Sequence, residues 1–205
     1  METNYRIAYD HWWKDLKRKQ PEEITTRLDV TYCSIDCKYT VIFFNSEYIL
    51  DCCNETIYRK IDGQVPEIIA SIIILNYLTY AQSPKETTKE WVSLKEFSSG
   101  GSLFYPAFHK SSIVDLITGF GHNAQQLLTC ATALGGQPAS FGDASVIFHA
   151  FPEISLCVVV WEGDDEVEAN ATMLFDPSTE PLLHIESTIG LGMYLASELK
   201  KQAIL

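Results

Sequence analysis

The sequence is poor in positive charge. Only 15 lysine and arginine residues stand against 27 aspartate and glutamate residues, and the formal net charge is -12. Nucleic acid is bound through a basic face that contacts phosphates, and anionic lipid attracts clusters of basic side chains. We therefore expect neither nucleic acid nor a membrane as a partner. A small molecule or a protein partner fits the composition better.

The sequence also lacks a long apolar run. The most apolar helical stretch, Ile68–Leu78, falls well short of the roughly 20 residues that span a bilayer, so we expect it to be a buried helix. The first segment of the chain is charged and aromatic and lacks the apolar stretch of a signal peptide. On these grounds we expect a cytoplasmic protein.

Several catalytic motifs are missing. The chain contains neither the Gly-x-Ser-x-Gly turn of many hydrolases nor the His-Glu-x-x-His pair of zinc proteases. The segment Gly119–Ala124 has the spacing of a dinucleotide fingerprint, G-x-G-x-x-A. A fingerprint must follow a strand, whereas the preceding Ser112–Thr118 has helical periodicity. We interpret the glycines as a turn between helices.

Six cysteines are present, and Cys33, Cys37, Cys52 and Cys53 lie close together in sequence. Their spacing does not match the paired Cys-x2-Cys knuckles of zinc sites. If Cys52 and Cys53 lie in a strand, they point to opposite faces and cannot easily share a metal ion. The favoured interpretation is small buried side chains, and metal carriage through the four thiols stays an alternative.

What the chain does contain is a large apolar fraction. It is 46% hydrophobic and 12% aromatic over 205 residues, which is typical of one packed domain. The patterns predict an α+β fold in which helices pack on an antiparallel sheet built from residues 39–59 and 144–175. The expected parts are N-terminal helices in 1–37, a hairpin in 38–62, a helical middle in 66–136 with a polar connector at 83–90, strands in 143–176, and a C-terminal helix at 187–201.

The densest charge lies in Trp161–Glu168, between the apolar runs Leu156–Trp161 and Ala171–Phe175. Apolar runs of this length predict buried strands, so the acidic segment is expected to be a hairpin bend. Carboxylates packed this closely repel one another and need solvent, a cation or a basic partner. A solvated turn and a rim that faces a ligand both fit the pattern.

The leading hypothesis is a non-catalytic binding module with a pocket between sheet and helices. The candidate ligand-binding residues are the aromatic Trp91, Phe97, Phe104, Tyr105 and Trp161, and the polar Asp143, Asp164, Asp165, Glu166 and His184.

An enzyme is the alternative from another class. It would use Asp165 or Glu166 as a base and His184 as a proton shuttle, which requires these groups to converge on one cleft. His184 and Glu186 would share one face if that stretch is extended.

A set of short motifs carries a family resemblance. They are Trp91–Phe97, Tyr105–Phe108, Ala133–Gly136, Gly142–Asp143, the turn at Pro152, Trp161–Glu166 and Phe175–Asp176. Together they resemble an uncharacterised domain-of-unknown-function family common in anaerobic bacteria and archaea, some of whose members are fused to iron–sulfur domains or encoded near corrinoid-dependent methyl-transfer proteins. The resemblance implies an accessory protein of anaerobic metabolism and identifies neither a cofactor nor active residues. This chain lacks a ferredoxin-like cysteine segment, so an iron–sulfur role does not transfer to it.

Overall fold

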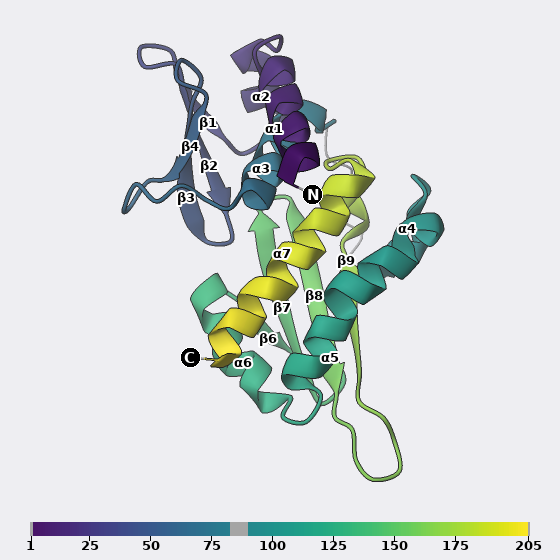
Figure 1. The fold of residues 1–205 in the computed structure, drawn as a ribbon. Helices are drawn as coiled ribbons and strands as arrows, with labels where there is room; N and C mark the ends of the chain where they lie inside the picture. The colour runs from purple at the N-terminus through teal and green to yellow at the C-terminus, as the bar shows by residue number, and fades with distance from the viewer. Residues whose placement is uncertain (1, 83–89, 205) are drawn as a thin grey trace.

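The chain folds into two antiparallel sheets with helices packed beside and between them (Figure 1). The computed structural model describes residues 2–82 and 90–204, so the expected polar connector at 83–90 lies, except for Glu90, outside the described residues. The α+β class expected from the sequence is confirmed. The strands of 39–59 and of 144–175, however, belong to two separate sheets and not to one.

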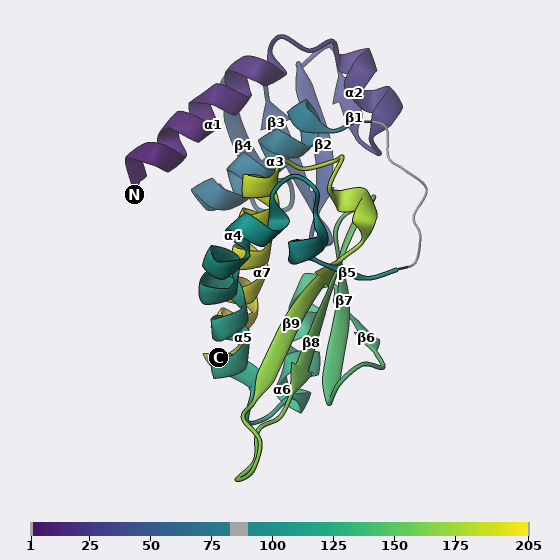
Figure 2. The ribbon, with the colours of Figure 1, turned by 90° about the vertical axis from the view of Figure 1, so that its right-hand side faces the viewer.

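The first sheet is formed by the N-terminal part of the chain. Its strands follow one another in sequence order, namely β1 (Thr31–Cys33), β2 (Lys38–Phe43), β3 (Ser46–Asp51) and β4 (Thr56–Arg59). The helices α1 (Glu2–Leu16), α2 (Pro21–Arg27) and α3 (Ile68–Tyr80) lie beside this sheet (Figures 1 and 2). Pro21 begins α2, as expected from the fixed φ of proline.

The turn between β2 and β3 connects this first sheet to the rest of the molecule. It consists of Phe44 and Asn45, both with positive φ, within the hairpin expected in 38–62. Positive φ at both central residues is the conformation of the tight hairpin turn that matches strand twist. The Phe44 amide donates to the Ala150 carbonyl at 3.0 Å, and the Phe44 ring is buried. Tertiary packing therefore holds an aromatic residue in a conformation that favours glycine or asparagine.

The second sheet has the strand order β5-β9-β8-β7-β6. Its strands are β5 (Val92–Ser93), β6 (Gln137–Ala139), β7 (Ala144–Phe151), β8 (Ile154–Trp161) and β9 (Asn170–Phe175). The three long strands agree with the sequence prediction, whereas the short β5 and β6 were not expected. Gly135, in the left-handed conformation, ends the helical segment before β6.

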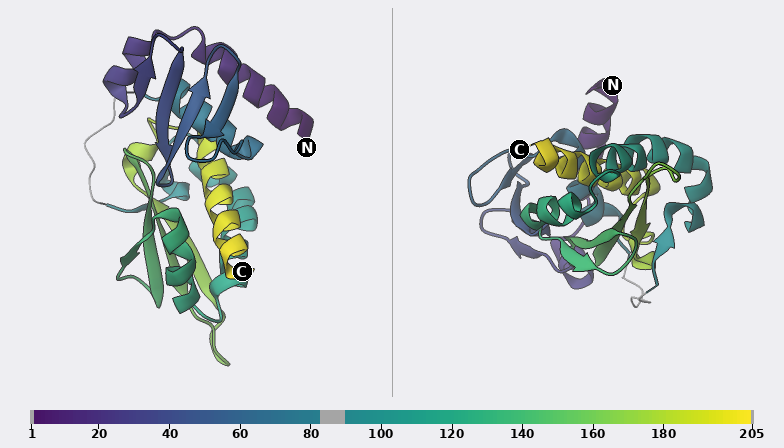
Figure 3. Two further views of the ribbon diagram at one scale, coloured as in Figure 1. Left: turned by 90° about the vertical axis from the view of Figure 1, so that its left-hand side faces the viewer. Right: turned by 90° about the horizontal axis from the view of Figure 1, so that it is seen from below.

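Helices cover one face of the second sheet (Figure 3). They are α4 (Gly101–Phe108), the π-helical segment His109–Ile113, α5 (Val114–Phe120), α6 (Gln125–Ala131) and α7 (Ile185–Ile204). The helical path continues without a break through Pro106. Single π-helical turns inserted between α-helical segments are a known way to continue a helix past an irregular point.

The remaining regular segments are short 3-10 turns at Leu94–Glu96, Thr132–Leu134 and Pro177–Thr179.

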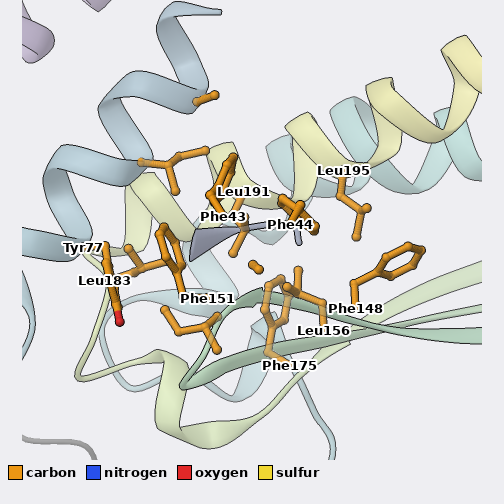
Figure 4. Close-up of a cluster of buried hydrophobic side chains, with 14 of the residues drawn as sticks. Phe43, Phe44, Tyr77, Phe148, Phe151, Leu156, Phe175, Leu183, Leu191 and Leu195 are labelled. Carbon is orange, nitrogen blue, oxygen red and sulfur yellow. The ribbon is translucent and has the colours of Figure 1, made fainter. Parts of the chain in front are cut away.

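The hydrophobic core lies where the two sheets meet α7. Figure 4 shows Phe43 and Phe44 from the β2–β3 hairpin among Phe148 and Phe151 of β7 and Leu191 of α7. The Phe43 and Phe151 rings lie 5.1 Å apart, and Tyr77 of α3 stacks on Phe151 at 3.9 Å. One continuous core thus joins both sheets and fixes α3 and α7 side by side. Among the residues that the structure describes, no helix has the length and apolarity needed to cross a bilayer.

Candidate functional site

The acidic segment after Trp161 forms the bend of the β8–β9 hairpin, which extends beyond the body of the molecule (Figures 1 and 2). All its carboxylates are exposed, namely Glu162, Asp164, Asp165, Glu166 and Glu168. They line neither of the two cavities described below. The expected arrangement, an aromatic-lined cavity with an acidic rim, is therefore not formed.

Hydrogen bonds explain part of the acidic composition of this bend. Asp164 Oδ1 accepts the backbone N–H groups of Glu166 and Val167, both at 2.8 Å. These bonds stabilise the carboxylate and lower the pKa of Asp164 below its usual value. Glu162 Oε1 accepts the Ala124 amide at 2.5 Å, and the Glu162 amide donates to Asp143 Oδ2 at 2.7 Å. Asp143, Glu162 and Asp164 thus close turns in this structure.

The five candidate aromatic residues do not share one cavity. Phe97 is buried, with its ring 5.7 Å from that of Phe175. The Lys95 ammonium lies 4.1 Å from the centre of the Tyr105 ring. Trp161 is 39% exposed at the end of β8. Trp91 and Phe104 line two different cavities.

One cavity lies between α1, α3 and α7, and its volume is about 380 Å³. Its apolar wall is supplied by Tyr5, Ala8 and Trp12 of α1, Ile69, Ile72 and Ile73 of α3, Phe104 of α4, and Ile189, Gly190 and Met193 of α7. Polar side chains also line it, namely Asn4, His184, Glu186 and Ser187. Of the residues proposed from the sequence, Phe104 and His184 meet here, together with Glu186.

His184 precedes the first turn of α7 and is held in place by hydrogen bonds. Its backbone N–H donates to Oδ1 of the fully buried Asn76 on α3, at 3.0 Å. Its ring Nδ1 accepts the Glu186 amide in a long bond of 3.4 Å, and the ring meets Tyr80 edge-on. An accepting Nδ1 places the ring proton on Nε2, so neutral His184 is a hydrogen-bond donor through Nε2. Glu186 lies in the first helical turn, where the helix dipole favours a carboxylate.

Gly190 leaves space in the cavity wall. It lies inside α7, where glycine costs about 1 kcal/mol of stability relative to alanine. A Cβ at this position would meet Ile69 at 3.5 Å, which is an ordinary contact. Packing therefore does not require the glycine at this position of the cavity wall.

Sequence reasoning did not place α1 and α3 in the site. The apolar residues on every side of α3 indicated a central helix but not which side adjoins a cavity. An adjacent tryptophan pair in a terminal helix is expected to anchor that helix to a core. Trp13 is buried in the core as such an anchor, whereas Trp12 is half-buried and lines the cavity. The adjacent tryptophans, which point to different sides of a helix, were the available signal.

The enzyme hypothesis requires Asp165 or Glu166 to approach His184. Asp165 and Glu166 lie in the bend of the β8–β9 hairpin, whereas His184 lies beside α3 at the start of α7, at the other end of the second sheet (Figure 1). The carboxylates do not line the cavity that contains His184. The structure therefore does not form the proposed acid–base pair.

A second, more open cavity of about 420 Å³ lies over the second sheet, where Trp91, His149, Glu153 and Asp176 contribute to its lining. Two of its carboxylates already have protein partners. Glu153 accepts the Tyr77 hydroxyl and the Asp29 amide, and Asp176 accepts the Ser178 amide at 2.8 Å. These bonds give both carboxylates a structural role, so this cavity is the weaker candidate for a ligand site.

The four N-terminal cysteines lie at one end of the first sheet. Cys52 and Cys53 follow β3 in a turn and not in a strand, and Cys33 and Cys53 are exposed, so their interpretation as buried side chains is wrong. Within residues 2–82 and 90–204, no group of three or more His, Cys, Asp or Glu side chains is arranged to hold a metal ion. The metal-carrier hypothesis therefore has no ligand set in this part of the chain.

Comparison with known proteins gives a family and no function. No curated protein and no solved structure matches the chain significantly. The model of one family matches residues 20–198, and its description is Domain of unknown function (DUF3786). The matched residues include both sheets, the helices α2 to α6 and the first part of α7. The chain belongs to the DUF3786 family.

Proposed function

We propose that this protein is a non-catalytic binding module that holds a small molecule in the cavity between α1, α3 and α7. The observation that carries the proposal is the cavity itself, about 380 Å³ in volume, with a mainly apolar wall and a few polar side chains. Small-molecule sites in proteins commonly have roughly 300–1,000 Å³ and this same combination of apolar wall and few polar groups. The metabolic setting, anaerobic metabolism, is an expectation from the family resemblance.

The volume limits the size of the ligand. It lies near the lower end of the range for such sites, so a ligand with one or two rings fits better than a tetrapyrrole such as haem or a corrinoid. The side chains of Trp12 and Phe104 suit a flat apolar ring, because aromatic rings pack favourably face to edge or offset.

The polar side chains limit the chemistry of the ligand. Neutral His184 supplies an N–H donor through Nε2, and Glu186 supplies a carboxylate acceptor. A ligand with a neighbouring acceptor and donor, such as the amide edge of a heterocycle, would satisfy both. A ligand that carries only negative charge would be repelled by Glu186 and by the net charge of -12.

The proposal is tested by screening small heterocycles that carry an amide edge, with ligand-observed NMR on the full chain. Gly190→Leu is the variant that fills the cavity, and Gly190→Ala is its matched control, because an alanine Cβ fits beside Ile69. We expect compounds that bind the wild type and Gly190→Ala but lose binding to Gly190→Leu, whose fold is checked by circular dichroism.

Two results would overturn the proposal. Compounds that bind Gly190→Leu as well as the wild type occupy some other place, and a screen without any binder removes the small-molecule role. Haem, a corrinoid, a flavin and divalent cations belong in the same screen, and binding of a tetrapyrrole in the cavity would contradict the size limit.

A further inference from the structure

Two turns that carry cysteines lie side by side at one end of the first sheet. Lys38 at the start of β2 pairs with Asp51 at the end of β3, so the β1–β2 turn and the β3–β4 turn are adjacent. The Cys52 amide donates to the Cys37 carbonyl at 3.0 Å, which joins the two turns directly. Residues far apart in sequence thereby place Cys37 next to Cys52 and Cys53.

The Cys37 and Cys53 side chains are neighbours across these two turns, and Cys37 is the largest cause of the raised pKa of Cys53. Cys37 is also the largest cause that raises the pKa of Tyr32 to about 12. The Cys37 thiol itself donates to the Ser34 carbonyl at 3.8 Å, within its own turn. The side chains of Cys53 and Tyr32 thus both lie beside that of Cys37.

The other cysteines are less suited to react with Cys53. Cys52 is half-buried, and this burial raises the pKa of its thiol to about 11, whereas Cys53 is exposed. Cys130 and Cys157 are buried elsewhere in the core. Cys37 is half-buried and Cys53 is exposed, so a small reagent can reach the pair.

The backbone of this region supports a special role for Cys37. Its φ is 52°, in the left-handed region that favours glycine or asparagine. A non-glycine residue held there costs on the order of 1–3 kcal/mol. The β1–β2 turn therefore holds a cysteine in a strained conformation at the point where the neighbouring turn presents two more.

We propose that Cys37 and Cys53 form a redox-active dithiol site that exchanges with small-molecule disulfides. The Cys37 thiolate attacks one sulfur of the disulfide, which forms a mixed disulfide on Cys37 and releases the first thiolate. That thiolate takes up a proton. The Cys53 thiol then gives its proton to solvent, and its thiolate attacks the Cys37 sulfur and releases the second small thiolate, which takes up a proton. The protein pair is oxidised to one disulfide, and the small disulfide is reduced to two thiols.

The site is tested on the full reduced chain with a defined buffer of oxidised and reduced glutathione. After quenching with iodoacetamide, tryptic digestion separates residues 28–38 from residues 39–59 because it cuts after Lys38 and Arg59. We expect a disulfide that joins these two peptides in the wild type and is lost in Cys37→Ser and Cys53→Ser. Mass spectrometry without reduction detects it.

Each variant has a matched control in the same peptide. Cys33→Ser and Cys52→Ser are expected to keep the cross-link, and circular dichroism confirms that all four variants fold. A cross-link that persists in Cys37→Ser or Cys53→Ser overturns the pair assignment. Absence of the cross-link in the folded wild type, under a buffer in which the urea-unfolded chain cross-links, overturns the redox site.

Discussion

Gly190 and Gly192 lie two positions apart on α7 under opposite steric constraints. A Cβ on Gly190 would meet Ile69 at 3.5 Å, whereas a Cβ on Gly192 would come within 2.3 Å of the fully buried Phe108 ring. Close packing thus requires glycine at position 192 and does not require it at position 190, which borders the cavity.

Gly190→Ala is expected to raise the free energy of unfolding by about 0.5–1 kcal/mol, because alanine loses less backbone entropy in a helix. Gly192→Ala is expected to lower it by about 1–3 kcal/mol, because the added methyl overpacks the core. Urea unfolding followed by circular dichroism measures both. Equal effects of the two substitutions would contradict the difference in packing described here.

Asn76 connects α3 to the start of α7 through its bond to the His184 amide. Asn76→Ala leaves that buried N–H without a partner and is expected to lower the free energy of unfolding by about 1–3 kcal/mol. It should also weaken any ligand that contacts the His184 ring. Denaturation and ligand titration measure the two effects.

Ser71→Ala is the control for this substitution, because Ser71 is buried on the same helix but its hydroxyl bonds only to Glu67 within the helix turn. Its effect should be clearly smaller. A loss in Ser71→Ala as large as that in Asn76→Ala would show that any polar deletion on α3 has this cost.

Elements with strong local signals could be predicted from the sequence. Alternating or continuous apolar residues identified β7, β8 and β9. The short strands β5 and β6 could not be predicted, because two or three residues are too few to show the alternation of apolar and polar side chains. They form strands only by pairing with the longer strand beside them. The two sheets meet through contacts between residues far apart in sequence, such as the bond of the Phe44 amide to the Ala150 carbonyl, and local sequence patterns do not contain such contacts.

The candidate site was predicted only in part for a similar reason. His184, Phe104 and Glu186 were recognised as candidates, and the structure brings them together. The acidic bend was favoured because a dense run of charge is easy to recognise in a sequence. In the structure, however, the Asp164 carboxylate accepts hydrogen bonds from backbone amides of the same bend. The cavity wall comes largely from apolar residues of α1 and α3, which in sequence look like ordinary core residues.

Phe44 is expected to be essential for the junction of the two sheets. Phe44→Ala removes a buried ring that lies 5.6 Å from Tyr194 and 6.5 Å from Phe148, and should lower the free energy of unfolding by about 3–5 kcal/mol. Asn45→Gly in the same turn is the control. Asn45 is exposed, and glycine accepts its positive φ, so its effect should stay within about 0.5 kcal/mol. A small loss in Phe44→Ala would mean that the ring contributes little to joining the sheets.

The hairpin bend is expected to lose its order in acid through Asp164. Because backbone N–H groups lower the folded-state pKa of Asp164, its contribution is complete above the unfolded pKa of about 3.9 and is lost as the pH falls through the lower folded value. The amide resonances of Glu166 and Val167 should therefore be constant from neutral pH to about pH 5 and shift below about pH 4. Asp164→Ala should give the disordered shifts at every pH. Asp165→Ala is the control, because Asp165 is exposed and has no such bonds in the described structure, and it should leave the pH profile unchanged. An equal effect of the two substitutions would show that the overall charge of the bend, and not the Asp164 bonds, keeps it ordered.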